Sequence, residues 1–267
     1  MNRILPVLFL LSLWGWSSCK SPEGTDAKNN SGKGGLDALN ASIAKDPDND
    51  SLYFDRAGYW MEQSAFDSAI ADMTKALSLD SATRPDYYRM LADAYLMNVQ
   101  PREAVSTMNK ALQLFPNDLA TMLKLAEVHL ILKQHMAALA SLDKVFMRDP
   151  QNAQAYYLAG HVFYEMGDTG RAVNAYQKAV DLEPEFRKAW IQLGDVLSEL
   201  KNPRAIAYYD NAILMDSLDE VVLEKKAYAL YSLGKNAEAI ALYQKICVRF
   251  PNYEPAFYNL GFLYKQI

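Results

Sequence analysis

A spacing of small residues recurs along most of this 267-residue chain and limits what it can fold into. In the segment 155–184 the small residues are Gly160, Ala172 and Ala179, and Pro184 closes the segment. Three other segments keep the same gaps: Ala92, Ala104, Ala111, Pro116; Ala126, Ala138, Val145, Pro150; and Ala227, Ala239, Ile246, Pro251. Two are degraded: Ala57, Ala69 and Ala76 end in Ser81, and Gly194, Ala205 and Ala212 end in Ser217 with one residue lost. A period of about 34 residues in six copies indicates a repeat protein.

Each repeat is predicted to contain two helices. The stretches between breakers are too long for strands, and their apolar residues recur every three or four positions. The turn inside the repeat falls in segments rich in Gly, Asn and Pro, at 165–170, 201–203 and 233–236. We expect the small residues of the two helices to face each other, with Trp60, Tyr95 and Phe163 filling the space beside them. The closing proline cannot continue a helix and redirects the chain.

This order of large, small and aromatic residues with a closing proline resembles the tetratricopeptide repeat. The resemblance covers residues 35–267 and implies an all-α fold, a right-handed superhelical solenoid of stacked antiparallel helix pairs with a concave groove. We expect a half repeat at 35–49, whose single helix runs from Leu36 to Lys45, and a final helix at 254–267. The six full repeats are predicted at 50–84, 85–118, 119–152, 153–186, 187–219 and 220–253.

The resemblance also implies which side chains of the first helices line the groove. They are Phe54, Arg89, Leu96, Leu123, Glu127, Leu130, Tyr157, His161, Tyr164, Ile191, Tyr228 and Tyr231. Family members that grip a peptide's terminal carboxylate use Lys and Asn there, whereas this chain has Asp93, Glu127 and Asp195. We therefore expect a hydrophobic or mildly basic segment, held by aromatic anchors such as Tyr157 and Tyr164. The alternative, that these side chains only pack between neighbouring repeats, fits the sequence equally well.

The first nineteen residues predict export. Arg3 precedes thirteen uncharged residues, and Ser17 and Ser18 then lead to Cys19. The apolar run is shorter than the roughly 20 residues that span a bilayer. Its end resembles the lipobox of bacterial lipoproteins, although Trp16 stands where that family usually has Leu. The resemblance implies a signal peptide at 1–18 and a lipid anchor such as palmitate on Cys19; an ordinary signal peptide with a cysteine nearby is the alternative.

Residues 19–34 contain almost nothing to bury and predict a flexible, solvated tether. A lipid-anchored body is expected in the bacterial cell envelope. Lys20 is not the Asp that retains lipoproteins at the inner membrane of enterobacteria, which favours the outer membrane, in either leaflet. Four Asp-Ser pairs, beginning at Asp50, Asp67, Asp80 and Asp216, resemble the O-glycosylation acceptor of Bacteroidota. Capping of helices and turns is the interpretation we favour for them.

The remaining observations argue against catalysis. The net charge is −5 and the basic residues are scattered, which argues against a nucleic-acid partner. His129 is expected in the core and His135 in a turn, while His161 and Glu165 share a helical face without a third metal ligand. No phosphate loop or nucleophile elbow is present. We expect no cofactor and no metal, but a non-enzymatic scaffold or adaptor that binds another envelope protein or peptide.

The last helix supports an alternative hypothesis, in which the chain is a self-associating structural module. Phe262 and Leu263 make this helix unusually apolar for the end of a solenoid. A homodimer through the C-terminal helix would bury them, although one exposed apolar pair needs no explanation. Near this end, Cys247 lies in an apolar stretch and is expected to be a small buried hydrophobic residue.

Overall fold

The protein, described as a computed structural model over residues 33–80 and 82–266, is built of α-helices. The predicted signal peptide, Cys19 and residues 19–32 of the predicted tether lie outside the described residues. The helices are α1 (Lys33–Lys45), α2 (Asp50–Glu62), α3 (Phe66–Leu79), α4 (Pro85–Met97), α5 (Pro101–Leu114), α6 (Leu119–Ile131), α7 (His135–Phe146), α8 (Ala153–Glu165), α9 (Thr169–Leu182), α10 (Arg187–Glu199), α11 (Arg204–Met215), α12 (Glu220–Ser232), α13 (Asn236–Arg249) and α14 (Glu254–Gln266). No strand occurs in the described part of the chain.

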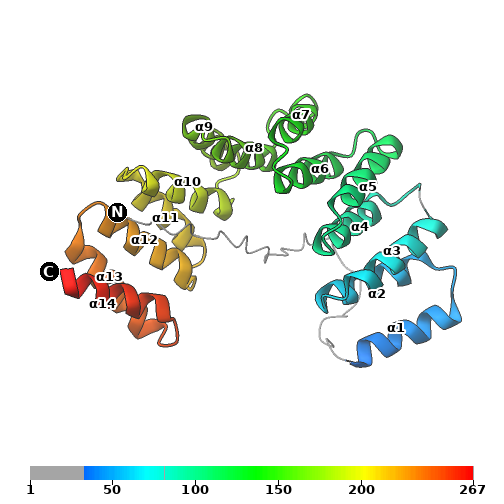
Figure 1. Ribbon diagram of the computed structural model, residues 1–267, viewed down its shortest axis with the longest axis horizontal. Helices are drawn as coiled ribbons and strands as arrows, with labels where there is room; N and C mark the ends of the chain where they lie inside the picture. Colours follow the sequence, from blue (N-terminus) through cyan, green and yellow to red (C-terminus); the bar gives the residue numbers. More distant parts are fainter. Residues whose placement is uncertain (1–32, 81, 267) are drawn as a thin grey trace, which may run out of the picture.

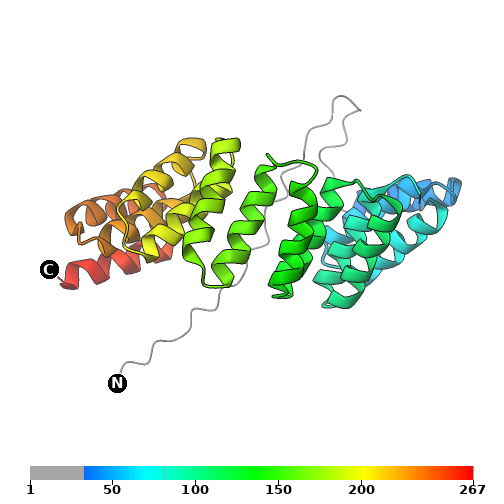
Figure 2. The same cartoon turned by 90° about the horizontal axis from the view of Figure 1, so that it is seen from above.

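Successive helices stack side by side into an arch, with α1 at one end and α14 at the other (Figure 1). The first helices α4, α6 and α8 lie on its inner side, while α5, α7 and α9 lie outside (Figure 1). Seen from above, the same pairs follow one another along the length of the molecule (Figure 2). The predicted all-α solenoid of paired helices is confirmed. The single helix α1 begins at Lys33, three residues before the predicted helix start.

The predicted small residues lie where the two helices of a repeat touch. Ala57, Ala69, Ala92, Ala104, Ala172 and Ala239 have no exposed surface. Gly160 and Gly194 are also buried, and a tyrosine ring lies against each of them. The expected aromatic neighbours Trp60, Tyr95 and Phe163 are half-buried and pack against the core. The close approach of paired helices is therefore confirmed.

The turn within each repeat has the same backbone conformation in all six copies. One residue has a positive φ in each turn: Ser64, Val99, Lys133, Gly167, Lys201 and Gly234, with φ between 51° and 78°. The following N–H donates to a carbonyl five residues back, as Gln100 does to Tyr95 and Asp168 to Phe163. This is the Schellman closure of a helix, which a left-handed residue makes possible. Only two of the six turns use glycine, so the others adopt a conformation that costs energy.

The core is a row of separate clusters instead of one body. One cluster joins Met122, Leu142 and Leu158 of repeats three and four, and another joins Tyr176 and Leu193 of repeats four and five. Each repeat therefore depends on its neighbours for burial of its apolar face. The arch is a scaffold that holds its inner side chains at fixed spacing.

The four Asp-Ser pairs serve two structural purposes through their aspartates. Asp80 accepts hydrogen bonds from the N–H groups of Ala82 and Thr83, and Asp216 accepts one from Leu218. These two cap turns, as expected. Asp50 instead accepts from the hydroxyl of Tyr87, and Asp67 accepts from the amide of Asn98. Those two carboxylates connect the first repeat to the second.

Candidate interaction groove

The candidate groove residues all lie on the even-numbered helices α2 to α12. Tyr228 is exposed and the other eleven are half-buried. Eight of them also pack against core clusters: Phe54, Leu96, Leu123, Leu130, Tyr157, Tyr164, Ile191 and Tyr231. Phe54, for example, stacks on Tyr87 of the next repeat with ring centroids 4.8 Å apart. These side chains therefore support neighbouring repeats and keep part of their surface open, so both interpretations of the sequence apply.

The middle of the groove is an aromatic cluster on α8 and its neighbours. The ring of His161 lies edge-on to Tyr157 and to Tyr176, with centroids 4.6 Å and 5.3 Å away. Tyr157 also packs on Phe186, the residue directly before α10, with ring centroids 4.9 Å apart, which links α8 to the start of α10. One turn further along α8, the hydroxyl of Tyr164 donates to Glu199 at 2.7 Å. We refer to Tyr157, His161, Tyr164 and Tyr176 as the aromatic centre.

The aromatic centre holds its titratable groups neutral. Burial lowers the pKa of His161 to about 4, against a smaller opposing effect of Glu165. Burial, with Glu127 and Asp195 nearby, raises the pKa of Tyr157 to about 12. A charged form costs free energy in this apolar environment, so neither group ionises near neutral pH. The aromatic centre therefore offers hydrogen bonds without charge.

Two of the three histidines, His129 and His135, differ from the sequence-based expectations. His129 is only half-buried, because its Nδ1 reaches across the turn to Gln134 Oε1 at 2.8 Å; its prediction as a core residue is wrong. His135 is the first residue of α7 and pairs with Glu165, with Nε2 and Oε2 2.8 Å apart. Glu165 is thus engaged by His135, while His161 packs between tyrosines. Over residues 33–80 and 82–266, no three His, Cys, Asp or Glu side chains gather as a metal site.

Two groove acids, Asp93 and Asp195, are each paired with a lysine of the next repeat. Lys124 Nζ lies 3.0 Å from Asp93, and also 2.8 Å from Glu127 on its own helix. Lys225 Nζ stands in the equivalent place, 2.5 Å from Asp195. These lysines follow the same register, since each lies two residues before the small residue of its helix. Because the lysines offset part of the negative charge, the groove attracts a basic partner less than its acidic residues suggest.

Two further polar contacts join successive even-numbered helices. Arg89 Nη1 of α4 donates to Oδ2 of Asp118 at 2.7 Å, and Asp118 also caps α6 through the N–H of Thr121. Asn259 on α14 donates to Glu224 on α12 at 2.8 Å. Burial raises the pKa of Glu224, and the neighbouring Lys225 opposes that effect. Polar contacts therefore supplement ring packing between successive helices of the groove.

The sequence-based search missed Tyr176, which belongs to the second helix α9. Tyrosine stands four residues after the second small residue in repeats four, five and six, as Tyr176, Tyr209 and Tyr243. All three are almost fully buried. This recurrence was readable from the sequence, but the second helices were not expected to reach the groove.

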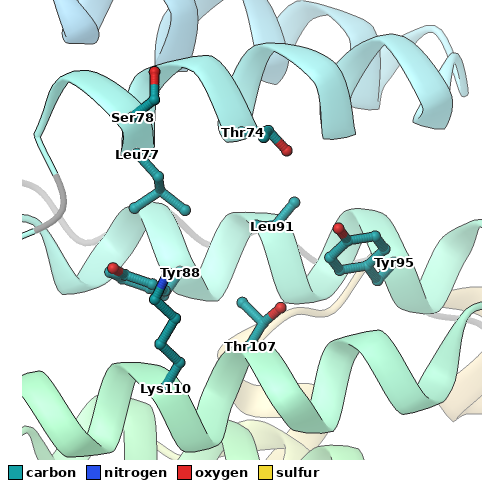
Figure 3. Close-up of a pocket in the computed structure, with 8 residues that line it drawn as sticks. All are labelled: Thr74, Leu77, Ser78, Tyr88, Leu91, Tyr95, Thr107 and Lys110. Atoms are coloured by element: carbon teal, nitrogen blue, oxygen red, sulfur yellow. The ribbon is translucent and has the colours of Figure 1, made fainter.

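A separate hollow of about 390 Å³ lies between α3 and α5, over α4 (Figure 3). Its lining residues are Thr74, Leu77 and Ser78 of α3, Tyr88, Leu91 and Tyr95 of α4, and Thr107 and Lys110 of α5. Thr74 and Ser78 donate their hydroxyls to backbone carbonyls of their own helix. None of the candidate groove residues lines this hollow, so it is distinct from the aromatic centre.

The fold and the groove define an α-solenoid, a class of repeat proteins that presents an extended concave surface to protein partners. Two family models described as tetratricopeptide repeat match residues 98–162 and 198–254, and one described as TPR repeat matches residues 160–201. The chain therefore contains tetratricopeptide repeats within an all-α solenoid of that type, and such repeats form protein-interaction scaffolds. Each matching model describes a repeat and none a catalytic domain.

The similar proteins share the fold at low identity. The chain is 26% identical over 238 residues to the DnaJ protein P58IPK homolog B of Oryza sativa subsp. japonica, covering 78% of this chain and half of that protein. Among solved structures, the APC/C hetero-tetramer Cut9-Hcn1 matches with a TM-score of 0.65 at 19% identity, over 87% of this chain and 46% of that one. A tetratricopeptide repeat protein from Parabacteroides merdae matches with a TM-score of 0.63 at 15% identity, over 85% and 90%.

None of the helices in the described part of the chain is both long and apolar enough to cross a membrane.

Proposed function

We propose that this protein is a non-enzymatic adaptor that binds a partner protein segment along its inner groove. The observation that carries the proposal is the aromatic centre. There, Tyr157 and His161 are half-buried, and the described residues supply no hydrogen bond to their polar atoms. Rigid aromatic side chains at the centre of a concave surface are the usual anchors of protein recognition. A segment lying in the groove would bury them between apolar side chains of its own.

The proposal includes a location in the bacterial envelope, held by a lipid on Cys19. It rests on the export pattern of residues 1–18, on the cysteine at its end and on the polar stretch that follows. A lipid anchor with more than one acyl chain holds a protein stably at a membrane. An adaptor acts by binding its partner at a particular location, so the anchor would determine which partners the groove meets.

The groove is tested by a paired substitution, Tyr157→Ala with Tyr164→Ala. Crosslinking in native envelopes followed by pull-down should recover a partner with the native chain and lose it with this variant. Met136→Ala with Met147→Ala is the matched control, because both methionines are exposed at or beside the outer helix α7. The control should retain capture, and circular dichroism should show the same helix content in all forms. Unchanged capture by the tyrosine variant would refute the groove proposal.

The anchor is tested independently by Cys19→Ala. We expect this form to leave the membrane fraction, and metabolic labelling with a fatty acid should mark the native chain alone. A Cys19→Ala form that still partitions with membranes would remove the lipid anchor from the proposal. The groove experiment would keep its meaning in that case, since it depends on other residues.

Exposed aromatic residues on α14 favour a second candidate function, self-association. Phe257, Tyr258, Phe262 and Tyr264 leave 42% to 77% of their surface open, while Leu263 is buried against the preceding repeat. A second copy packed on this face would cover them. Sedimentation of a form beginning at residue 33 tests the idea: a monomer at all concentrations would exclude it, and a dimer lost on Phe257→Ser with Tyr264→Ser would support it.

A further inference from the structure

Two tyrosines of the second helices, Tyr176 and Tyr209, extend across the first helices toward the groove. A Cβ built on Gly160 would lie 2.5 Å from the ring of Tyr176, and one on Gly194 would lie equally close to the ring of Tyr209. Each ring therefore crosses its partner helix at the glycine, where no side chain stands in the way. The hydroxyl of Tyr209 then reaches Asp195, the residue directly after the glycine, at 2.8 Å.

In repeat five a groove carboxylate satisfies this hydroxyl, because Asp195 accepts a hydrogen bond from Tyr209. In repeat six the carboxylate of Glu224 lies close enough to raise the pKa of Tyr243, in addition to the larger effect of burial. The hydroxyl in repeat five therefore takes its acceptor from the groove side.

In repeat four the acceptor is missing among the described residues. Tyr176 has no exposed surface, and its hydroxyl oxygen has no hydrogen-bond partner there. His161 occupies the place that Asp195 holds in repeat five, but it turns a ring edge toward Tyr176. A buried hydroxyl without a partner costs free energy, so natural proteins rarely keep one without a reason. Its hydroxyl would be satisfied by an acceptor that comes from outside the chain.

The charges around the aromatic centre select the kind of acceptor. Burial raises the pKa of Tyr176, and Tyr157, Tyr164, Asp195 and Glu165 raise it further. Anionic neighbours disfavour another anion in the same place. Lys124 of the preceding repeat is already paired with Asp93 and Glu127. A neutral acceptor therefore fits this position better than a carboxylate does.

We propose that the aromatic centre receives an Asn or Gln side chain of the partner segment, whose amide oxygen accepts from the hydroxyl of Tyr176. The amide NH₂ group then faces the ring nitrogen of His161 or the surrounding carboxylates. A change of side-chain rotamer at His161 opens the buried hydroxyl, and the apolar stem of the amide packs between the rings. This proposal deepens the groove function and rests on it.

The test uses purified full chain and labelled, end-capped nonapeptides with apolar flanks and a central Asn, Gln, Asp or Leu. Fluorescence anisotropy should show the Asn or Gln peptide binding about three- to tenfold tighter than the Leu and Asp peptides, as one hydrogen bond in a buried site provides. In the Tyr176→Phe variant this advantage should disappear, so that the Asn or Gln peptide binds about as tightly as the Leu peptide. Tyr209→Phe is the matched control and should keep the advantage, because its hydroxyl is already bonded to Asp195.

The outcomes separate this proposal from the groove function. An amide advantage that survives Tyr176→Phe, or Leu or Asp peptides that bind as tightly as the amides, overturns the amide proposal and leaves the groove function standing. Binding that is insensitive to Tyr157→Ala with Tyr164→Ala, or no binding by any peptide, overturns both. Unfolding midpoints of both Phe variants, measured beside the native chain, show that each is folded.

Discussion

The ring of Tyr176 lies across the backbone of Gly160, so close that a Cβ on this glycine would stand 2.5 Å from two ring carbons. Real Cβ atoms do not approach rings to that distance, and the ring itself is fully buried. The pair fixes the distance between α8 and α9 at the middle of the arch. It also carries the tyrosine hydroxyl to the aromatic centre, so packing and recognition depend on the same contact.

Substitution of Gly160 by Ala should therefore destabilise the protein. The added methyl group must displace a buried ring, which costs about 1–3 kcal/mol as overpacking in a core. The better helix propensity of Ala offsets at most about 1 kcal/mol of this. Urea unfolding followed by circular dichroism should show a lower midpoint with an unchanged slope.

Gly261 is the control for this substitution, because it holds the same repeat position on α14 and a Cβ there meets nothing within 4 Å. Gly261→Ala should leave the midpoint unchanged or raise it by the helix propensity of alanine. Equal destabilisation by the two substitutions would mean that the contact with Tyr176 is not the cause.

The fold was predictable from the sequence because one spacing of small residues recurs six times, and each copy predicts the same contact between two helices. The turns inside the repeats followed from that register. The contact of Tyr176 with Gly160 was not predicted, although both residues recur at fixed positions of the repeat. The sequence does not show how far a side-chain ring extends across the opposite helix. The prediction for His129 failed for a local reason, because its ring interacts with the side chain of Gln134 across the turn and is not buried in the core.

Acid should weaken the native protein through His161. Its pKa falls from 6.5 to about 4 on folding, mainly through burial, while Glu165 acts in the opposite direction. Between these values the unfolded chain binds a proton that the folded chain does not, so stability rises with pH across the window. The full contribution is present above about pH 6.5 and is lost as pH falls toward about 4, amounting to about 3 kcal/mol.

The measurement is the difference in unfolding free energy between the native chain and His161→Phe at several pH values. Phe retains a ring against Tyr157 and Tyr176 but does not titrate. The native chain should lose more stability than the variant between pH 6.5 and 4, and the two curves should run parallel above pH 7. Parallel curves throughout would show that His161 is not held neutral by the fold.

Val99 should be replaceable with a gain in stability. It is 85% exposed and has a φ of 58° in the turn of the second repeat, where repeats four and six use glycine. A β-branched side chain in this left-handed conformation costs about 1–2 kcal/mol, and glycine removes most of that cost while the unfolded chain gains some freedom. Val99→Gly should raise the thermal midpoint by a few degrees. Val248→Gly, at an equally exposed valine within helix α13, should lower it.

The groove candidates show which features of the site could be predicted from the sequence. The repeat predicted which helices carry these residues and at which positions, and Tyr157, His161 and Tyr164 do lie together. The pairing of Lys124 with Asp93 and of Lys225 with Asp195 depends on how neighbouring first helices are staggered, which no spacing within one repeat encodes. Asp93 and Asp195 therefore read as free acids in the sequence, while the structure uses them to join repeats.

Asp195 should contribute more to stability than its partner Lys225. Its carboxylate accepts from the buried hydroxyl of Tyr209 at 2.8 Å and pairs with Lys225 at 2.5 Å, so its removal takes away the acceptor of one group and the counter-charge of the other. Loss of a buried acceptor costs about 1–3 kcal/mol, whereas a half-exposed ion pair is worth about 1 kcal/mol or less. Asp195→Ala should therefore lower the unfolding free energy by about 2–3 kcal/mol, and Lys225→Met by under about 1 kcal/mol. Tyr209→Phe in the Asp195→Ala background should recover part of the loss, because it removes the stranded hydroxyl. A double variant as unstable as the sum of its parts would show that the tyrosine and the aspartate do not act together.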